Sequence, residues 1–398
     1  MAENKPPAEV GKRVARARKR RGLTQLGLAQ RTSYSRSHIA QVEAGHKVAT
    51  ASFIAAVAEA VQVDQTELYG QPFRGETPRG DRVHAPIPDI RRVMTFVDVP
   101  PDLEGPPRDL DRLAQELRRA DGHRHRSRHS QLGALLPALL EELTWHAYET
   151  ETPRAWALLN RAHTTAASLT RRLGYTDLTS VIMERAAVSA RMSQDPNLPP
   201  LMSHRRALVM MSVSAWGPAL KLLRRSASQV DHDRPDAVEV YGSLHLRAAV
   251  VAARAGDAAT AQDHYAQAVE TSERAGSPSL DRHGTDFDPG NLAIHRAALA
   301  VELRDYDEAL KADRAIKPRL LASVAPERRA HHLIDMTRVH VEQNELDRAL
   351  RRLLAAERAA PQMVRYHPAA RSVATHMQDR HRVLSEDLRG LLARMRLA

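Results

Sequence analysis

The chain has 398 residues and no cysteine, which excludes disulfides, thiolate metal sites and a cysteine nucleophile. Aromatic residues make up only 4% of it, whereas Ala, Leu and Arg abound, and this composition favours helices over β-sandwiches. The formal net charge is +11, and residues 1–50 hold 11 Lys or Arg against 3 acidic residues, so we expect a basic N-terminal surface that faces phosphate.

Residues 9–70 are predicted to form a compact helical domain. Apolar residues recur at helical spacing through it, Gly22 and Gly45 are suited to end helices, and Thr24 is a good N-cap. The expected helices cover residues 9–20, 25–31, 35–43, 51–61 and 65–69.

The next segment, residues 71–108, is rich in structure breakers and holds 8 prolines. Neither a long helix nor a central strand tolerates that density of proline. We therefore interpret the segment as a linker, with residues 93–99 as a candidate short strand.

Residues 109–398 show helical periodicity almost throughout and contain three similar segments, at 245–269, 293–316 and 333–361. Each has a helix, a short polar turn and a second helix, with a small residue at one fixed position that lets the two helices approach closely. These small residues are Ala261, Ala309 and Ala349. Further helix pairs are predicted by periodicity at 132–148, 153–173, 175–193 and 202–230, and one or two capping helices at 366–395.

These segments resemble tetratricopeptide repeats. Arg304 and Asn344 replace the usual turn glycine, and the fixed alanines are 48 and then 40 residues apart instead of about 34. The resemblance therefore implies a degenerate, tetratricopeptide-like α-solenoid with a concave groove. The matching residues are Gly256, Tyr265, Ala268, Tyr306, Ala356 and Pro361.

Residues 23–45 resemble the helix-turn-helix of phage-repressor and Xre-type (Cro/C1-type) regulators, and the resemblance extends over about 9–70. It implies an all-α chain that begins with a five-helix, lambda-repressor-like DNA-binding domain. Ile39 and Val42 are expected in the core of that domain, and Glu43 is expected to pair within it. The matching residues are Leu23, Thr24, Gln25, Leu28, Ala29, Ser35, Ile39, Glu43 and Gly45.

By this resemblance, residues 35–43 form the recognition helix, which fits a major groove about 12 Å wide. Arg36 has the geometry to donate to guanine O6 and N7, and Gln41 can pair with adenine N6 and N7 or contact a phosphate. Ser35 lies on the same face, Ser37 can contact a base or a phosphate, and Ala40 can pack on a thymine methyl.

Phosphate contacts are expected beside that helix. Thr24 and Gln25 begin the preceding helix, where side chains and backbone N–H groups meet phosphate. For His38, at the edge of the face, the sequence leaves open a base contact or a solvated side chain. The candidate DNA contacts are Thr24, Gln25, Ser35, Arg36, Ser37, His38, Ala40 and Gln41, with Arg13, Arg16 and Lys47 for sequence-independent phosphate contacts.

The stretch GHRHRSRHSQ at 122–131 places His123, His125 and His129 close together. It contains no carboxylate and its arginines repel a cation, so we predict a solvated basic segment and no metal site. No phosphate-loop, dinucleotide-binding, hydrolase or metalloprotease motif occurs in the sequence. We therefore predict neither a cofactor nor an enzymatic activity.

Three residues of the repeats are candidate ligand contacts. Asn291 and His295 lie one turn apart on the first helix of a pair, and Asn344 lies in a turn. An Asn on the groove face can hold a peptide backbone with its amide. The alternative is that Asn291 only caps its helix after Pro289 and Gly290.

The layout is a helix-turn-helix domain at 9–70, a proline-rich linker at 71–108 and a tetratricopeptide-like region at 109–398. It is similar to that of actinobacterial transcriptional regulators and of peptide-responsive regulators of Gram-positive bacteria. The similarity implies a homodimer that binds double-stranded DNA at a palindromic operator and senses a peptide, small molecule or partner protein. The alternative is a protein-interaction adaptor whose DNA binding is incidental. The N-terminus lacks the apolar core of a signal peptide and no apolar stretch of about 18 residues occurs, so we expect a cytoplasmic, nucleoid-associated protein without a membrane span.

Overall fold

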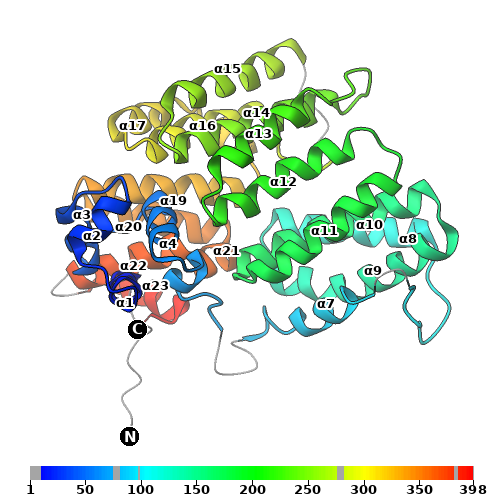
Figure 1. Cartoon of the computed structure of the whole chain (residues 1–398), viewed down its shortest axis with the longest axis horizontal. Helices are drawn as coiled ribbons and strands as arrows, with labels where there is room; N and C mark the ends of the chain where they lie inside the picture. The colour runs from blue at the N-terminus through cyan, green and yellow to red at the C-terminus, as the bar shows by residue number, and fades with distance from the viewer. Residues whose placement is uncertain (1–9, 75–80, 97–98, 276–281, 381–383, 398) are drawn as a thin grey trace, which may run out of the picture.

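The computed structural model describes residues 10–74, 81–96, 99–275, 282–380 and 384–397. Within these ranges the regular structure is helical and no strand occurs, so the predicted all-α class is confirmed. Figure 1 shows the first helices at one side of a curved array formed by the remaining helices.

Five helices form the N-terminal domain around a closed apolar core. Thr24, Thr50 and Asp64 cap the second, fourth and fifth helices with their side chains, which explains why these helices begin where the sequence predicts. Leu28, Ile39 and Phe53 are fully buried among the five helices. The helices are α1 (Val10–Arg20), α2 (Gln25–Arg31), α3 (Arg36–Glu43), α4 (Ala51–Val61) and α5 (Gln65–Tyr69).

The proline-rich segment 71–108 contains a short helix, α7 (Ile87–Val93), instead of the candidate strand. Pro86 and Pro88 lie at its first turn, where proline fits a helix, and Ile87, Ile90 and Val93 are buried in the core of the repeat region. The described residues of 93–99 form no strand, and residues 97–98 of this prediction lie outside the described ranges. This part of the segment is therefore packed against the repeats.

The remaining helices pair as antiparallel hairpins. Helices occupy each segment that periodicity predicted, and the last helices cover the end of the array. These helices are α8 (Leu110–His125), α9 (His129–Thr150), α10 (Pro153–Leu173), α11 (Thr176–Met192), α12 (Leu198–Ser212), α13 (Trp216–Ala227), α14 (Ala237–Arg254), α15 (Ala258–Ala275), α16 (Pro289–Glu302), α17 (Tyr306–Ala315), α18 (Pro318–Ser323), α19 (Pro326–Glu342), α20 (Leu346–Ala359), α21 (Pro361–Tyr366), α22 (Pro368–Arg380) and α23 (Glu386–Met395).

The three similar hairpins share one turn geometry despite their different turn residues. Gly256 has a left-handed φ of 81°, and Arg304 and Asn344, which replace it in the next two hairpins, have φ of 62° and 58°. The backbone therefore keeps the glycine conformation at some cost in strain. The small residues predicted to allow close approach, Ala261, Ala309 and Ala349, are all buried at the hairpin interfaces.

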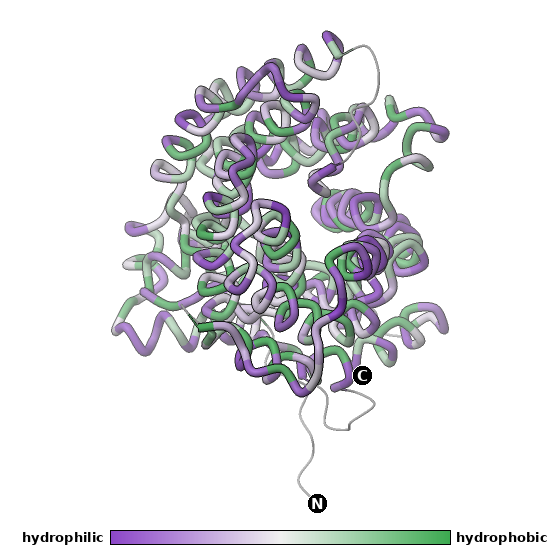
Figure 2. Tube along the Cα trace, turned by 90° about the vertical axis from the view of Figure 1, so that its right-hand side faces the viewer, coloured by the Kyte–Doolittle hydropathy of each residue, from purple (hydrophilic) through white to green (hydrophobic). Residues whose placement is uncertain are grey.

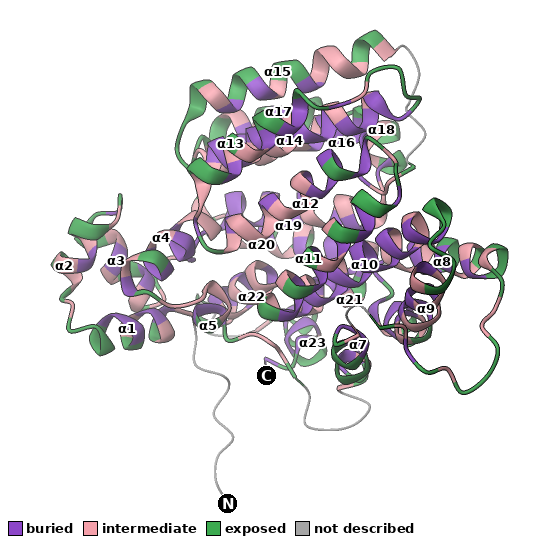
Figure 3. Ribbon diagram, turned by 45° about the vertical axis from the view of Figure 1, so that its right-hand side comes forward, coloured by how far each residue is buried: buried purple, intermediate pink, exposed green. Residues whose placement is uncertain are grey.

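The helices of a hairpin differ in burial. α14 carries twelve buried residues, whereas its partner α15 carries three, Ala261, His264 and Ala268. Figure 3 shows exposed residues along the outer α15 and mostly buried ones on α14 and α16 beneath it. Along the tube in Figure 2, hydrophobic and hydrophilic residues alternate within each turn of most helices, as expected for amphipathic helices that bury one side.

The array curves until its two ends meet. At the start of α9 the backbone N–H of Ser130 donates to Gln362 Oε1 of α21 at 3.1 Å, and Gln362 Nε2 donates to Ser130 Oγ at 3.3 Å. Arg172 of α10 forms an ion pair with Glu327 of α19 across the interior. The repeats thus form a closed ring around their concave side, and the N-terminal domain lies against both α12 and α22.

Candidate functional site

Helix α3, the predicted recognition helix, presents a polar face to solvent. Ser35 caps α3 by accepting a hydrogen bond from the backbone N–H of His38 at 3.2 Å. Arg36, Ser37 and Gln41 are exposed, as is Ser35, and Ala40 between them is half-buried. These five predicted contacts therefore share one accessible face. On the opposite face, as expected, Ile39 and Val42 are buried in the domain core.

A buried ion pair fixes this helix to the rest of the domain. Arg18 of α1 donates to both carboxylate oxygens of Glu43, through Nε at 2.6 Å and an η nitrogen at 2.9 Å. Gln25 Nε2 also donates to Glu43 at 2.9 Å, so this predicted phosphate contact is held by a carboxylate in the structure. The hydrogen bonding that Arg18 donates to Glu43 is also the main reason why the pKa of Arg18 is raised.

His38 turns towards the domain interior. Its ring centroid lies 5.0 Å from that of Tyr34 and 5.3 Å from that of Phe53, and its Nε2 is buried without a hydrogen-bond partner. Burial, with the charges of Lys47 and Arg304, lowers the pKa of His38 to about 4. The ring is therefore neutral at physiological pH and held by aromatic packing.

The predicted phosphate contacts differ in their surroundings. Thr24 and Arg16 are exposed, and the Thr24 hydroxyl accepts from the backbone N–H of Gly27 at 2.9 Å as the cap of α2. Arg13 donates to the carbonyls of Leu68 and Tyr69 at 2.9 and 2.8 Å, which secures the end of α5. Lys47 forms an ion pair with Glu342 of α19 at 3.2 Å.

The loop after the recognition helix docks on the C-terminal helices. His376 of α22 contacts the carbonyl of Gly45 at 3.1 Å, and Arg380 donates to the carbonyl of His46 at 3.0 Å. Val48 packs into the apolar cluster of the last repeats. At the turn before α3, the Arg304 guanidinium lies 4.2 Å from the centroid of the Tyr34 ring. Both ends of α3 are thus connected to the repeat region.

The three predicted ligand contacts are not gathered in one place. His295 lines the interior cavity, and its Nδ1 lies 2.7 Å from the carbonyl oxygen of Asn291. Asn291 is buried behind it, with both polar atoms of its amide unpartnered, and Asp288 instead caps the helix. Asn344 is exposed in the turn between α19 and α20, away from that cavity.

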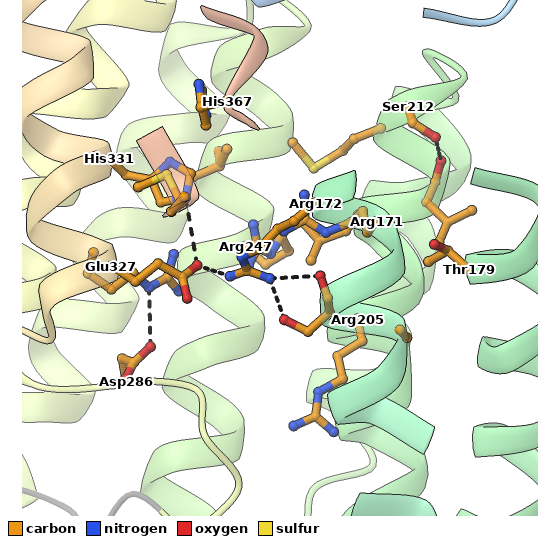
Figure 4. A pocket seen from close by; sticks show the side chains of 18 of the residues that line it. Arg171, Arg172, Thr179, Arg205, Ser212, Arg247, Asp286, Glu327, His331 and His367 are labelled. Atoms are coloured by element: carbon orange, nitrogen blue, oxygen red, sulfur yellow. Dashed lines mark hydrogen bonds and ion pairs between the residues drawn. The ribbon is translucent and has the colours of Figure 1, made fainter. Parts of the chain in front are cut away.

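A cavity of about 450 Å³ lies inside the ring of repeats. Nine arginines and eight histidines line it, against five carboxylates. Figure 4 shows Arg171, Arg172 and Arg247 close together, with Glu327 and His331 across from them. Sequence reasoning missed this cluster because its members come from different helices and no local motif contains them.

Part of the histidine-rich stretch 122–131 lines this cavity, so the predicted solvated segment is wrong for His125 and His129, whereas Arg126 and Arg128 are exposed as predicted. His129 is 2% exposed, neither of its ring nitrogens has a partner, and His125 lines the cavity. Burial and the nearby Arg172 lower the pKa of His129 to about 3. Among the residues that the structure describes, no cluster of three or more His, Asp or Glu is arranged to hold a metal ion.

Comparison with known proteins identifies the N-terminal domain. Residues 9–68 match the helix-turn-helix domain family. A search of curated proteins gave no match. In the described ranges, no helix combines the length and apolarity needed to cross a bilayer.

Three solved structures are similar at low sequence identity. BtubC (BKLC) from P. vanneervenii is 16% identical, with a TM-score of 0.38 and coverage of 63% of this chain and 91% of that one. Pseudomonas aeruginosa pilF is 15% identical, with a TM-score of 0.34 and coverage of 63% and 94%. Bacillus thuringiensis PlcR, in complex with the peptide PapR7 and DNA, is 13% identical, with a TM-score of 0.35 and coverage of 85% and 99%. At these TM-scores the likenesses carry no inference about function.

Proposed function

We propose that this chain is a sequence-specific, DNA-binding transcriptional regulator. The observation that carries the proposal is the exposed face of α3, where Arg36, Ser37 and Gln41 point to solvent on a helix rigidly held by the Arg18–Glu43 ion pair. An exposed, preorganised helix of this kind can enter a major groove and read base edges. The match of residues 9–68 to the helix-turn-helix domain family supports it.

We infer that the regulator acts as a homodimer on a palindromic operator. One recognition helix covers only a half-site, and helix-turn-helix dimers set two such helices about 34 Å apart. The tetratricopeptide-like region is the part of the chain proposed to dimerise and to sense a peptide, small molecule or partner protein. The enclosed cavity and the contacts that dock the DNA-binding domain on the repeats support a sensory role.

The test is selection of binding sites from random duplex DNA by the full chain, followed by titration of the selected site at several salt concentrations. We expect a short motif with two-fold symmetry and an affinity that falls steeply with salt, because phosphate contacts release counterions. Recovery of no enriched motif would overturn the proposal and favour a protein-interaction adaptor. A motif without symmetry would overturn the dimeric reading alone.

A further inference from the structure

The arginines of the interior cavity outnumber the carboxylates that can neutralise them. Each lining carboxylate already has a cationic partner: Asp121 is bound by Arg161, Asp286 by Arg328 at 3.3 Å, and Glu327 by Arg172. Glu302 and Asp335 form ion pairs with Arg338 at 3.9 and 3.0 Å. Glu302 also pairs with Arg254 at 3.4 Å and Asp121 with Arg124 at 3.8 Å, so the lining carboxylates are shared among other arginines and none of these pairs includes Arg171 or Arg247.

Arg171 and Arg247 are the two cavity arginines on which the inference depends. Within the described part of the chain, the Arg171 guanidinium forms no hydrogen bond or ion pair, although the Arg171 carbonyl accepts from the backbone N–H of Gly174. In that same part of the chain, the Arg247 guanidinium has one hydrogen-bond partner, the neutral ring of His204. It donates to His204 Nε2 through Nε at 3.4 Å and through an η nitrogen at 3.3 Å. The two side chains come from α10 and α14, both line the cavity (Figure 4), and the charge of Arg171 acts on Arg247.

The pKa values of both arginines are lowered in these surroundings. Burial, followed by the charges of Arg328 and Arg254, lowers the pKa of Arg171 to about 10. Burial and the charges of Arg328 and Arg171 likewise hold the pKa of Arg247 well below its usual range. Like charges in a poorly solvated cavity repel strongly, and this repulsion acts on side chains that are the most basic in proteins.

We propose that the cavity binds the phosphate group of a small molecule between Arg171 and Arg247. Guanidinium groups bind phosphate oxygens through paired, charge-assisted hydrogen bonds, and an anion placed there would neutralise the excess positive charge. Apolar residues, among them Leu208, Val250 and Ile294, line the same cavity and would contact the rest of the molecule.

The closed shape of the array favours a small ligand over an extended peptide. Contacts between Ser130 and Gln362 and between Arg172 and Glu327 join the first and last repeats, so the concave side is not an open groove. A volume of about 450 Å³ lies in the range of small-molecule sites.

The DNA-binding domain contributes to the wall of this cavity. Gln65, Thr66 and Tyr69 of α5 line it, and Gln65 Nε2 donates to the carbonyl of Met211 on α12 at 3.1 Å. A ligand that changes these contacts changes how the domain is held, and by linkage DNA would then change the affinity for the ligand. This coupling deepens the proposed function and rests on it, whereas phosphate binding does not.

The first experiment measures anion binding by the full chain without DNA. Thermal unfolding is recorded in rising inorganic phosphate, in citrate and in chloride at one fixed ionic strength. We expect phosphate to raise Tm in a saturable manner and above both other anions. A phosphate effect no greater than that of chloride, or a larger effect of citrate, would overturn the proposal.

Substitutions of the two cavity arginines test whether phosphate binds between them. Arg171→Gln and Arg247→Gln should each weaken phosphate binding by about tenfold, since each removes a charged donor. Both variants should melt at or above the wild-type Tm without phosphate, because each relieves like-charge repulsion. The matched control is Arg191→Gln, an exposed arginine on the neighbouring α11, and it should bind phosphate as the wild type does.

Equal phosphate affinity in the cavity variants and the control would contradict the site. If Arg171→Gln does not fold, Arg171→Lys keeps the charge and removes the planar fork, and it should still weaken binding. An unchanged phosphate affinity in Arg171→Lys would then overturn the assignment.

The second experiment separates the site from the proposed function. Arg36→Ala should lose operator affinity while its phosphate-induced rise in Tm stays intact. In the wild type, phosphate at fixed ionic strength should change operator affinity severalfold, and Arg171→Gln should abolish that change. Operator binding that is insensitive to phosphate in the wild type would overturn the coupling. Failure to find an operator, with an intact rise in Tm, would refute the proposed function and leave the phosphate site standing.

Discussion

Arg36 on the recognition helix and Arg171 in the interior cavity place the same side chain in opposite surroundings. Arg36 is exposed on a face that the domain leaves to solvent, whereas Arg171 is half-buried and lines an interior cavity together with other arginines. Water stabilises the first charge at little cost, while the second is held without a carboxylate. An unpartnered interior charge is therefore the more specific indication of a ligand, although the N-terminal surface carries the more obvious basic pattern.

The two regions also differ in how they use histidine. The DNA-binding domain contains one histidine with a strongly lowered pKa, His38, at about 4. The cavity contains several, and burial together with neighbouring arginines lowers the pKa values of His129, His295 and His331 to about 3. Neutral histidines keep the cavity from gaining still more positive charge at physiological pH.

We therefore expect acid to unfold the repeat region before the DNA-binding domain. This is the largest of the predicted effects. The unfolded chain takes up protons on these histidines below pH 6.5 and the folded chain does not until about pH 3, so stability is full above pH 6.5 and is lost as pH falls from there. Each histidine contributes up to about 1.4 kcal/mol per pH unit, which amounts to a few kcal/mol by pH 5.

Tryptophan fluorescence measures this directly, because the three tryptophans, Trp145, Trp156 and Trp216, all lie in the repeat region. Urea unfolding followed at pH 7.5 and pH 5 should give a clearly lower midpoint at pH 5. Identical midpoints would show that the cavity histidines titrate normally in the folded chain.

The Glu43→Gln substitution should destabilise the DNA-binding domain by about 3 kcal/mol, because it leaves the buried charge of Arg18 without its carboxylate. Hydrogen exchange of the amides in α1–α5 measures the effect. The matched control is Glu67→Gln, whose ion pair with Arg20 is exposed and should contribute less than about 1 kcal/mol. Equal effects of the two substitutions would contradict the assigned role of the buried pair.

The Arg36→Ala substitution should weaken binding to the selected operator by roughly 1–3 kcal/mol and relax the base preference at one position. Titration of the operator and of a variant site measures both effects. Arg191→Ala removes an equal charge from the exposed surface of α11 and should leave the base preference intact. If Arg36→Ala binds both sites as the wild type does, α3 is not the reading helix.

The smallest effect concerns the hairpin turns. Asn344→Gly should stabilise the repeat region by up to about 1 kcal/mol, since Asn344 holds a left-handed φ of 58° that glycine adopts without strain. Gly256→Ala is the reciprocal change in an open turn and should cost about 1 kcal/mol. Urea unfolding followed by tryptophan fluorescence compares them, and stabilisation by both would refute the shared turn geometry.

Much of the local structure was predictable because it depends on neighbours in the chain. Thr24 and Thr50 cap helices that begin at the predicted residues, and the apolar spacing of Ile39 and Val42 gave the buried face of α3. The turns at Arg304 and Asn344 were recognised by position even without glycine. The strand proposed within 93–99 was wrong in its described part, because Ile87, Ile90 and Val93 share a helical face that packs on the repeats.

The sequence by itself determined that this chain is all-helical, with an N-terminal helix-turn-helix domain and a degenerate repeat region, because caps, periodicity and turn residues act over a few positions. Only the tertiary structure decided that Gln25 and Lys47 have carboxylate partners, since Glu43 and Glu342 reach them from other helices. It also decided that Arg171 and Arg247 meet in one cavity. Closure of the ring of repeats brings helices together that are far apart in the sequence. The spacing of residues along the chain therefore does not predict that these two arginines line the same cavity.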